Sequence, residues 1–393
     1  MQSIVTGIDV GSHHVKVVIA QSPTDPRELP QILGTGYAES RGVQKGYVTG
    51  VQDAARSIAA ALSQASKAAR VKVKRAHLSI GGMGLEEAAA RGEVVVERGD
   101  SMVTDRDLAR AAKAAEAALA PQNTLNRRIL HSIPLSYWID GTKVLGKNPA
   151  GMKGARVSVE MLFVTALERH VHDLVEATES AGVEVEDVVA SPIAASFVAL
   201  NKMQKRVGCI LCNIGAETTS VAVFEDSAPV SVKVFPTGGS DITNDLALGL
   251  RISPEEAEQF KLGAVLGSTF PKRTVETILN RRTQDLFKQV EAHLKKIGRA
   301  ELLPAGVVLT GGGSQLHGAA ELAKQVLKLP ARIAGADNSS QGGRWQGQGG
   351  SWAVAYGLTV WGASEGAEFE NHEQGVFMDG LRSLWRWFKK FLP

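Results

Sequence analysis

Apolar and polar positions along the chain form a strand–turn–strand pattern that occurs twice. Residues 4–20 contain an apolar run, a polar turn at residues 9–12 and a second apolar run, which predicts a β-hairpin. Residues 207–224 have the same layout, with Asn213 and Gly215 at the turn. Two such hairpins far apart in the sequence predict a duplicated unit that holds a ligand between its copies.

Glycines mark two further points where backbone could approach a ligand. The apolar residues 307–310 run into a glycine cluster, and a helix is expected from about Leu316 to Leu329. Backbone at such a junction of strand and helix can lie flat against a nucleotide. Gly238 and Gly239 precede another predicted helix, and we expect their free N–H groups to contact phosphate.

Between residues 83 and 165 the expected order of elements changes to strand, helix and three strands. Thr104 is expected to cap the helix, which has an acidic first turn. This order predicts a small α+β insertion and not a continuation of a parallel sheet. The expected strands cover residues 93–98, 128–137, 138–144 and 156–165, and the helix covers residues 105–119.

Composition restricts the class of protein. The 393 residues are 44% hydrophobic and 22% charged, which fits a soluble protein with two domains. A net charge of only +3 does not indicate a protein whose whole surface binds nucleic acid. The sequence predicts no signal peptide and no transmembrane helix. Two cysteines, Cys209 and Cys212, argue against a disulfide scaffold; we expect both to be buried small hydrophobes.

The first hairpin carries residues suited to phosphate and Mg²⁺. Asp9 can hold a metal-bound water, Ser12 and the turn N–H groups can cradle phosphate oxygens, and Lys16 can supply a charge. The alternative is an ordinary edge hairpin without a ligand. His13 and His14 have no partner cluster, and we expect them to face solvent.

The two hairpins and the glycine cluster resemble the phosphate-1, phosphate-2 and adenosine motifs of the actin/Hsp70/sugar-kinase superfamily. The resemblance implies an ATP cleft between two similar α/β domains. It also matches Glu258 and Lys261 to ribose and adenine contacts, although a surface ion pair is the alternative. The resemblance implies an indirect Mg²⁺ contact from Asp9 and no assigned catalytic residue. The nucleotide-binding residues that it implies are Asp9, Gly11, Ser12, Lys16, Asn213, Gly215, Thr218, Gly238, Gly239, Glu258, Lys261, Gly311, Gly312, Gly313 and Ser314.

Within that superfamily the chain resembles the FtsA family of bacterial cell-division proteins. Residues 129–140 and 147–152 are similar to the signature of the family's subdomain 1C. Residues 271–300 carry eight Lys or Arg against three Asp or Glu and look like subdomain 2B, which binds the acidic tail of FtsZ. A solvated helix face is the alternative. The FtsZ contacts expected from the resemblance are Lys272, Arg281, Arg282 and Lys288.

The C-terminal end has a separate pattern. Residues 362–379 read as a flexible acidic linker. At helical spacing, apolar and basic side chains then fall on opposite faces, which is typical of a helix lying in a membrane interface; a core-packing helix is the alternative. The apolar residues are Leu381, Leu384, Trp385, Trp387, Phe388, Phe391 and Leu392, and the basic ones are Arg382, Arg386, Lys389 and Lys390.

Together these features predict an α/β, two-domain actin-like fold with a nucleotide cleft, an FtsA-type 1C insertion and a C-terminal amphipathic helix. The expected domains are 1A (residues 1–83 and 166–205), 1C (84–165), 2A (206–250 and 301–361), 2B (251–300), a linker (362–379) and a membrane helix (380–393).

The expected function is that of an ATP- and Mg²⁺-binding division protein that polymerises through 1C and domain 2. It would tether FtsZ to anionic phospholipid on the cytoplasmic face of the inner membrane at the division site. Later division proteins are further expected partners, and nucleic acid is not an expected partner. A pilus-assembly actin homologue or a phosphotransferase of the same fold are the alternatives. Asn213 and Glu217 depart from the phosphate-2 pattern, so we expect at most weak ATP hydrolysis.

Overall fold

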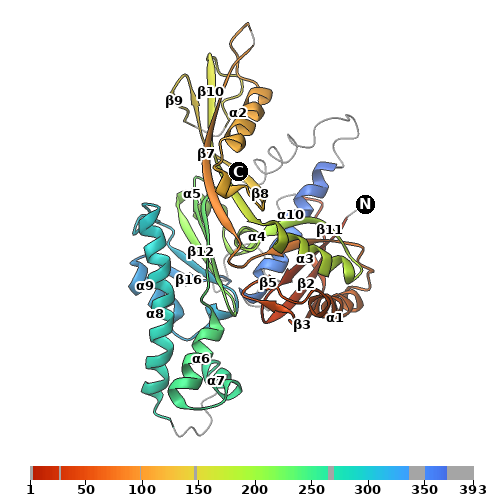
Figure 1. The fold of residues 1–393 in the computed structure, drawn as a ribbon, viewed down its shortest axis with the longest axis vertical. Coiled ribbons are helices and arrows are strands. Elements are labelled where there is room, and N and C mark those ends of the chain that lie inside the picture. Colours follow the sequence, from red (N-terminus) through yellow and green to blue (C-terminus); the bar gives the residue numbers. More distant parts are fainter. Residues whose placement is uncertain are drawn as a thin grey trace.

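The computed structural model describes residues 3–25, 28–97, 99–145, 148–263, 270–335 and 350–369, with side chains described to residue 364. Two five-stranded sheets of the same topology form its centre (Figure 1). The first has the order β11 (Glu184–Ala190), β6 (Arg75–Ile80), β1 (Ile4–Val10), β2 (His14–Gln21) and β3 (Gln31–Glu39). The second has the order β16 (Ala331–Ile333), β15 (Val307–Thr310), β12 (Cys209–Ile214), β13 (Thr219–Glu225) and β14 (Ala228–Phe235).

The strand directions in the two sheets also agree. β1 is antiparallel to β2 and parallel to β6, as β12 is antiparallel to β13 and parallel to β15. The duplication expected from the two hairpins therefore extends over both sheets.

Helices cover both faces of the first sheet. Val17 and Ile19 of β2 face α1 (Val51–Ala69), whereas Val18 between them faces α10 (Ala353–Phe369). Close approach is achieved by glycine: a Cβ at Gly7 would lie 2.2 Å from the Ala355 carbonyl oxygen, and one at Gly36 would lie 2.1 Å from that of Ala61. α3 (Glu168–Ser180) packs beside α1, and a two-residue turn joins the short strands β4 (Val43–Gln44) and β5 (Tyr47–Val48).

One hydrophobic core joins the two sheets, and α4 (Ser191–Ala199) lies within it. Ile193, Ala194 and Ala195 are fully buried against residues of both halves, including Leu211 of β12. On its other face the second sheet packs against α8 (Lys272–Lys296) and α9 (Ala319–Leu327). The short helix α5 (Lys202–Val207) leads from α4 into β12, and both Cys209 and Cys212 are buried, as expected.

Two smaller units lie at opposite ends of the elongated molecule (Figure 1). At one end, α6 (Gly239–Leu250) and α7 (Pro254–Lys261) share a small core with the first half of α8. At the other end, α2 (Asp105–Ala117) covers a four-stranded sheet of order β7 (Glu86–Val95), β10 (Arg156–Leu167), β8 (Arg127–Ile139) and β9 (Thr142–Lys143). The Ser231 hydroxyl of β14 donates to Glu87 of β7 over 2.8 Å, which ties this insertion to the second sheet.

The insertion has the expected order of elements, but its strand boundaries differ. Thr104 caps α2 through a reciprocal bond with Asp107, as predicted. β7 begins at Glu86 and not at residue 93, and the two strands expected over residues 128–144 are one strand, β8, followed by the two residues of β9. Tyr137 and Trp138 pair in regular register with Val159 and Ser158 of β10, so the strand continues through the position where a break was expected.

The helices near the C-terminal end also differ from expectation. Gly312–Gln315 and Gly350–Trp352 form single 3₁₀ turns, as does Pro121–Asn123 in the insertion. The helix expected from Leu316 begins at Ala319, because the 3₁₀ turn comes first. α10 continues to Phe369, so the expectation that residues 362–369 are not helical is wrong. The predicted membrane helix lies outside the described residues, among which no helix is long and apolar enough to cross a bilayer.

Candidate functional site

A cleft of about 430 Å³ lies between the two hairpins. Its walls come from both sheets, from the glycine cluster after β15 and from α6 and α7. All of the predicted nucleotide-binding residues line it except Gly238 and Ser314. The fold thus brings together residues from five separate stretches of the chain around one cavity.

Asp9 is a partly buried charge in the wall of the cleft. Its carboxylate accepts a 2.7 Å hydrogen bond from the Ser79 hydroxyl, and Lys16 stands opposite it in the β1–β2 pairing. Burial raises the pKa of Asp9, while Lys16 and the Ser79 hydrogen bond act in the opposite direction. A carboxylate held this way, with a cation beside it, is suited to a hydrated Mg²⁺ and a phosphate.

Gly238 and Gly239 do not offer free N–H groups, so that expectation is wrong. The Gly238 N–H donates to the Asp241 carboxylate (2.8 Å) and the Gly239 N–H donates to the Gly215 carbonyl (2.9 Å). The Ser240 N–H donates to the Ala216 carbonyl (2.7 Å). The start of α6 therefore fixes the backbone of the second hairpin turn.

The two hairpins carry their negative charge at different positions. The first has it on the strand, at Asp9, whereas the second has the neutral Asn213 at that position and the acidic Glu217 in the turn. Asn213 is the next-to-last residue of β12, and the turn after this strand carries Glu217. The Glu217 carboxylate accepts a hydrogen bond from the Lys45 N–H, in the turn between β4 and β5. This bond crosses the cleft from the second half of the molecule to the first.

Glu258 and Lys261 form an ion pair in the wall of the cleft. The Lys261 ammonium lies 2.5 Å from the Glu258 carboxylate and 2.8 Å from the Thr243 hydroxyl, and both side chains line the cleft. Hydrogen bonds from Lys261 and Thr243 lower the pKa of Glu258 against the opposing effect of burial. The pair is thus a charged wall at one end of the cleft and not a solvated surface pair.

The glycine cluster needs glycine at some positions only. Gly311 has φ +83°, and a Cβ there would lie 2.4 Å from both the Asn213 side chain and the Ile214 carbonyl oxygen. A Cβ at Gly313 would lie 2.3 Å from the Ile214 side chain, whereas at Gly312 it meets no described atom within 4 Å. Ser314 is buried and its hydroxyl donates to the Gly311 carbonyl, so it holds the turn and does not line the cleft.

Sequence reasoning missed several residues of the cleft. Ser79 holds Asp9, and its position two residues before Gly81 was the available signal. The Gly46 N–H donates to the Ser12 hydroxyl over 3.1 Å, which a search for phosphate motifs would not find. His13 is exposed, as expected, and His14 is half-buried; both residues also line the cleft.

Comparison with known proteins identifies the family. A family model described as "Cell division protein FtsA" matches residues 210–355, and one described as "SHS2 domain inserted in FTSA" matches residues 85–165. Cell division protein FtsA of Bacillus subtilis (strain 168) is 30% identical over 348 residues, which cover 83% of this chain and 77% of the relative. The chain belongs to the FtsA family. FtsA of Escherichia coli (strain K12) is 25% identical over 422 residues, covering 99% of this chain and 98% of the relative.

Solved structures show that this FtsA-family chain has an actin-like fold. A PilM–PilN type IV pilus biogenesis complex matches with a TM-score of 0.65 at 19% identity, covering 92% of this chain and 99% of that chain. MreB5 of Spiroplasma citri bound to ADP matches with a TM-score of 0.55 at 12% identity, covering 94% and 99%. The predicted two-domain fold with its family-specific insertion is therefore confirmed.

The basic helix α8 contains residues in two different situations. Arg282 forms a paired contact with the Asp245 carboxylate of α6, at 2.6 and 2.8 Å, which raises the pKa of the guanidinium. It therefore braces α6 against α8, although the family resemblance suggested a partner contact. Lys272 and Lys288 lie near Glu276 (3.6 Å) and Asp285 (3.2 Å), and Arg281 is exposed.

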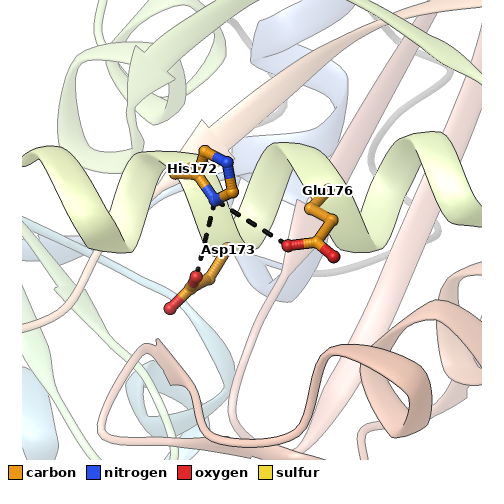
Figure 2. A group of neighbouring side chains, drawn as sticks. All are labelled: His172, Asp173 and Glu176. Carbon is orange, nitrogen blue, oxygen red and sulfur yellow. Dashed lines mark ion pairs between the residues drawn. The ribbon is translucent and has the colours of Figure 1, made fainter.

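Among the described residues, one group of side chains that could ligate a metal lies on α3, outside the cleft (Figure 2). His172 Nδ1 lies 3.6 Å from the Asp173 carboxylate and 3.8 Å from that of Glu176. His172 and Glu176 are exposed, and Arg169 already lies 3.4 Å from Asp173. This arrangement is that of a surface ion-pair cluster, and we assign it no function.

Proposed function

We propose that the cleft binds ATP together with Mg²⁺. The observation that carries the proposal is that the two hairpins and the glycine cluster, separate in the sequence, line one cavity. Asp9 would hold the hydrated Mg²⁺, while Ser12, Lys16 and the turn N–H groups would hold phosphate oxygens. Glu258 and Lys261 would contact the ribose and adenine, beside the glycine cluster. The bound Mg²⁺ would supply positive charge next to the phosphates.

Hydrolysis by this site is expected to be slow. Asn213 is the next-to-last residue of β12, which is the position of Asp9 in β1, and its amide carries no charge for Mg²⁺ or its water. A phosphoryl-transfer site depends on positioning and on charge around the transferred group. With a carboxylate at Asp9 but not at Asn213, the site is suited to bind ATP as a ligand that affects the conformation of the protein and is not rapidly hydrolysed.

Titration with ATP, with and without Mg²⁺, tests this function. We expect saturable binding that Mg²⁺ strengthens, and turnover well below the roughly 1–100 s⁻¹ of kinases. Absence of binding at millimolar ATP would remove the nucleotide function, and turnover in the kinase range would favour a phosphotransferase.

We also propose that the chain acts in division as a tether between FtsZ and the membrane. Membership of the FtsA family and the exposed basic face of α8 support this. Arg273, Arg281 and Lys288 are exposed on that helix and would receive an acidic FtsZ tail, whereas Arg282 would maintain the α6–α8 contact. Polymerisation through the insertion and the second half, and recruitment of later division proteins, belong to the same proposal.

Substitution at neighbouring arginines separates these two roles. Arg281→Glu is expected to weaken binding of an FtsZ-tail peptide, with the effect shrinking at high salt, and to leave the melting temperature unchanged. Arg282→Glu is expected to lower the melting temperature, because it places two acids against each other. Lys67→Glu on α1 is the matched charge control. Equal peptide binding by Arg281→Glu and the control would place the partner surface elsewhere.

The membrane anchor is proposed from the sequence of residues 381–392. Its aromatic residues would enter the headgroup boundary, and its four cations would attract anionic lipid by about 1 kcal/mol each. One such segment binds weakly, but many along a filament bind cooperatively through effective concentration. Removal of the residues after Gly380 should abolish sedimentation with anionic vesicles and leave ATP binding intact. Sedimentation equal to that of the full chain would disprove the anchor.

A further inference from the structure

Glu217 joins the two halves of the molecule at the phosphate end of the cleft. Its carboxylate accepts from the Lys45 N–H, and the next N–H along, that of Gly46, donates to the Ser12 hydroxyl. Two consecutive backbone donors of one turn are thus directed at the cleft. Such paired N–H groups are suited to bind an anion.

The donor side of this contact is held rigidly in the first half. Lys45 and Gly46 are the central residues of a two-residue hairpin turn, with φ values of 47° and 80°. The turn rests on Gly82, two residues past the end of β6, since a Cβ at Gly46 would lie 2.5 Å from the Gly82 Cα. Ser79 of β6 holds Asp9. The turn and the Asp9 carboxylate are therefore both attached to β6 and the residues that follow it.

The acceptor side is held rigidly in the second half. The turn that carries Glu217 is closed by the Gly215 N–H, which donates to the Thr218 carbonyl over 2.9 Å. The first N–H groups of α6 hold the carbonyls of Gly215 and Ala216. Gly238 is required beneath it, because a Cβ there would lie 2.8 Å from the Glu217 nitrogen. Glu217 thus presents a fixed negative charge to the same cavity as Ser12 and Lys16.

We propose that Glu217 makes this site discriminate between nucleoside diphosphates and triphosphates. This inference rests on the proposed nucleotide function. A diphosphate binds with the Glu217–Lys45 bond in place. The terminal phosphate of a triphosphate competes with the carboxylate for the Lys45 and Gly46 N–H groups and is repelled by it, so it binds only when that bond opens. The number of phosphates then sets how tightly the two halves are held together.

Isosteric and truncating substitutions separate the charge of Glu217 from its hydrogen bond. Glu217→Gln keeps an oxygen acceptor for the Lys45 N–H and removes the charge, whereas Glu217→Ala removes both. Glu225→Gln, at the far end of β13 where the side chain pairs with Arg299, is the matched control. ADP and ATP affinities are measured with Mg²⁺ for each protein, together with hydrogen exchange of the Lys45 amide without nucleotide.

In the wild type we expect ADP to bind more tightly than ATP. Glu217→Gln should raise the ATP affinity about tenfold relative to that of ADP, with Lys45 exchange close to wild type. Glu217→Ala should raise the same ratio and make the Lys45 amide exchange faster, and Glu225→Gln should change neither quantity.

Three results would overturn the proposal, and they are distinguishable. If both nucleotides bind but the affinity ratio moves less than twofold in both Glu217 variants, Glu217 does not discriminate and the nucleotide function stands. If neither nucleotide binds any of the proteins, the nucleotide function itself fails, and the inference fails with it. Lys45 exchange that is equally fast in wild type and Glu217→Ala would show that the cross-cleft bond does not form.

Discussion

In both hairpins of the cleft, the next-to-last residue of the first strand lies opposite a residue near the start of the second. In the first hairpin these residues are Asp9 and Lys16, and in the second they are Asn213 and Ser220. Both turns close in the same way, through a glycine N–H that donates to a carbonyl three residues on. The two hairpins therefore have the same backbone conformation and differ in the charge of their side chains.

The strand next to each hairpin repeats this difference. The Ser79 hydroxyl of β6 donates to Asp9, whereas the Thr310 hydroxyl of β15 donates to the Gly350 carbonyl over 2.9 Å. In the first copy the neighbouring hydroxyl stabilises a carboxylate, and in the second it stabilises a backbone connection. Of the two copies of the hairpin, the first thus carries the charged side chains suited to metal and phosphate, Asp9 and Lys16. The second contributes the bond that crosses the cleft, from Glu217.

The largest effect should come from removing the strand-end side chains one at a time. Asp9→Ala is expected to weaken Mg²⁺–ATP binding about 100-fold, because it removes a charged group and leaves Lys16 and Ser79 without their partner. Asn213→Ala should weaken it by no more than about threefold. Isothermal titration compares the two, and equal losses would mean that the copies contribute alike.

A smaller effect is expected at the glycines that back the second hairpin. Gly311→Ala should lower the free energy of unfolding by about 1–3 kcal/mol, because its φ is positive and a Cβ would meet Asn213 and Ile214. Gly312→Ala should stay within about 0.5 kcal/mol, since its Cβ would point into open space among the described atoms. Urea unfolding measures both, and similar losses would show that the second hairpin does not pack closely on this cluster.

The smallest effect is a pH-dependent change in melting temperature. Its sign should be positive when a carboxylate is removed from the first copy and negative when one is added to the second. Burial raises the pKa of Asp9 above its ordinary value of 3.8, so the folded state binds this proton more tightly than the unfolded state and loses stability as pH rises through the folded pKa. Asp9→Asn should therefore melt higher than wild type at pH 7, with the difference shrinking as pH falls toward about 4. Asn213→Asp should melt lower at pH 7. Melting curves at pH 7 and pH 5 give both signs, and a lower melting point for Asp9→Asn at pH 7 would contradict the argument.

The sequence alone was sufficient to predict structural features whose residues all lie within one short stretch of the chain. Alternating apolar runs around a glycine turn predict a hairpin wherever it lies in the fold, and both hairpins formed as predicted. The cap of α2 at Thr104 follows from a side chain that reaches backbone three residues away. Its partner is fixed by chain connectivity, so no knowledge of the rest of the molecule is needed.

Tertiary structure decided which of these features act in the cleft. The N–H groups at the start of α6 bind the second hairpin turn, and Arg282 binds Asp245, because the folded chain places an acceptor beside each donor. Glu217 meets the Lys45 N–H from 172 residues away. A polar group in a folded protein binds the nearest suitable partner in space, and the sequence does not show which distant residue that is.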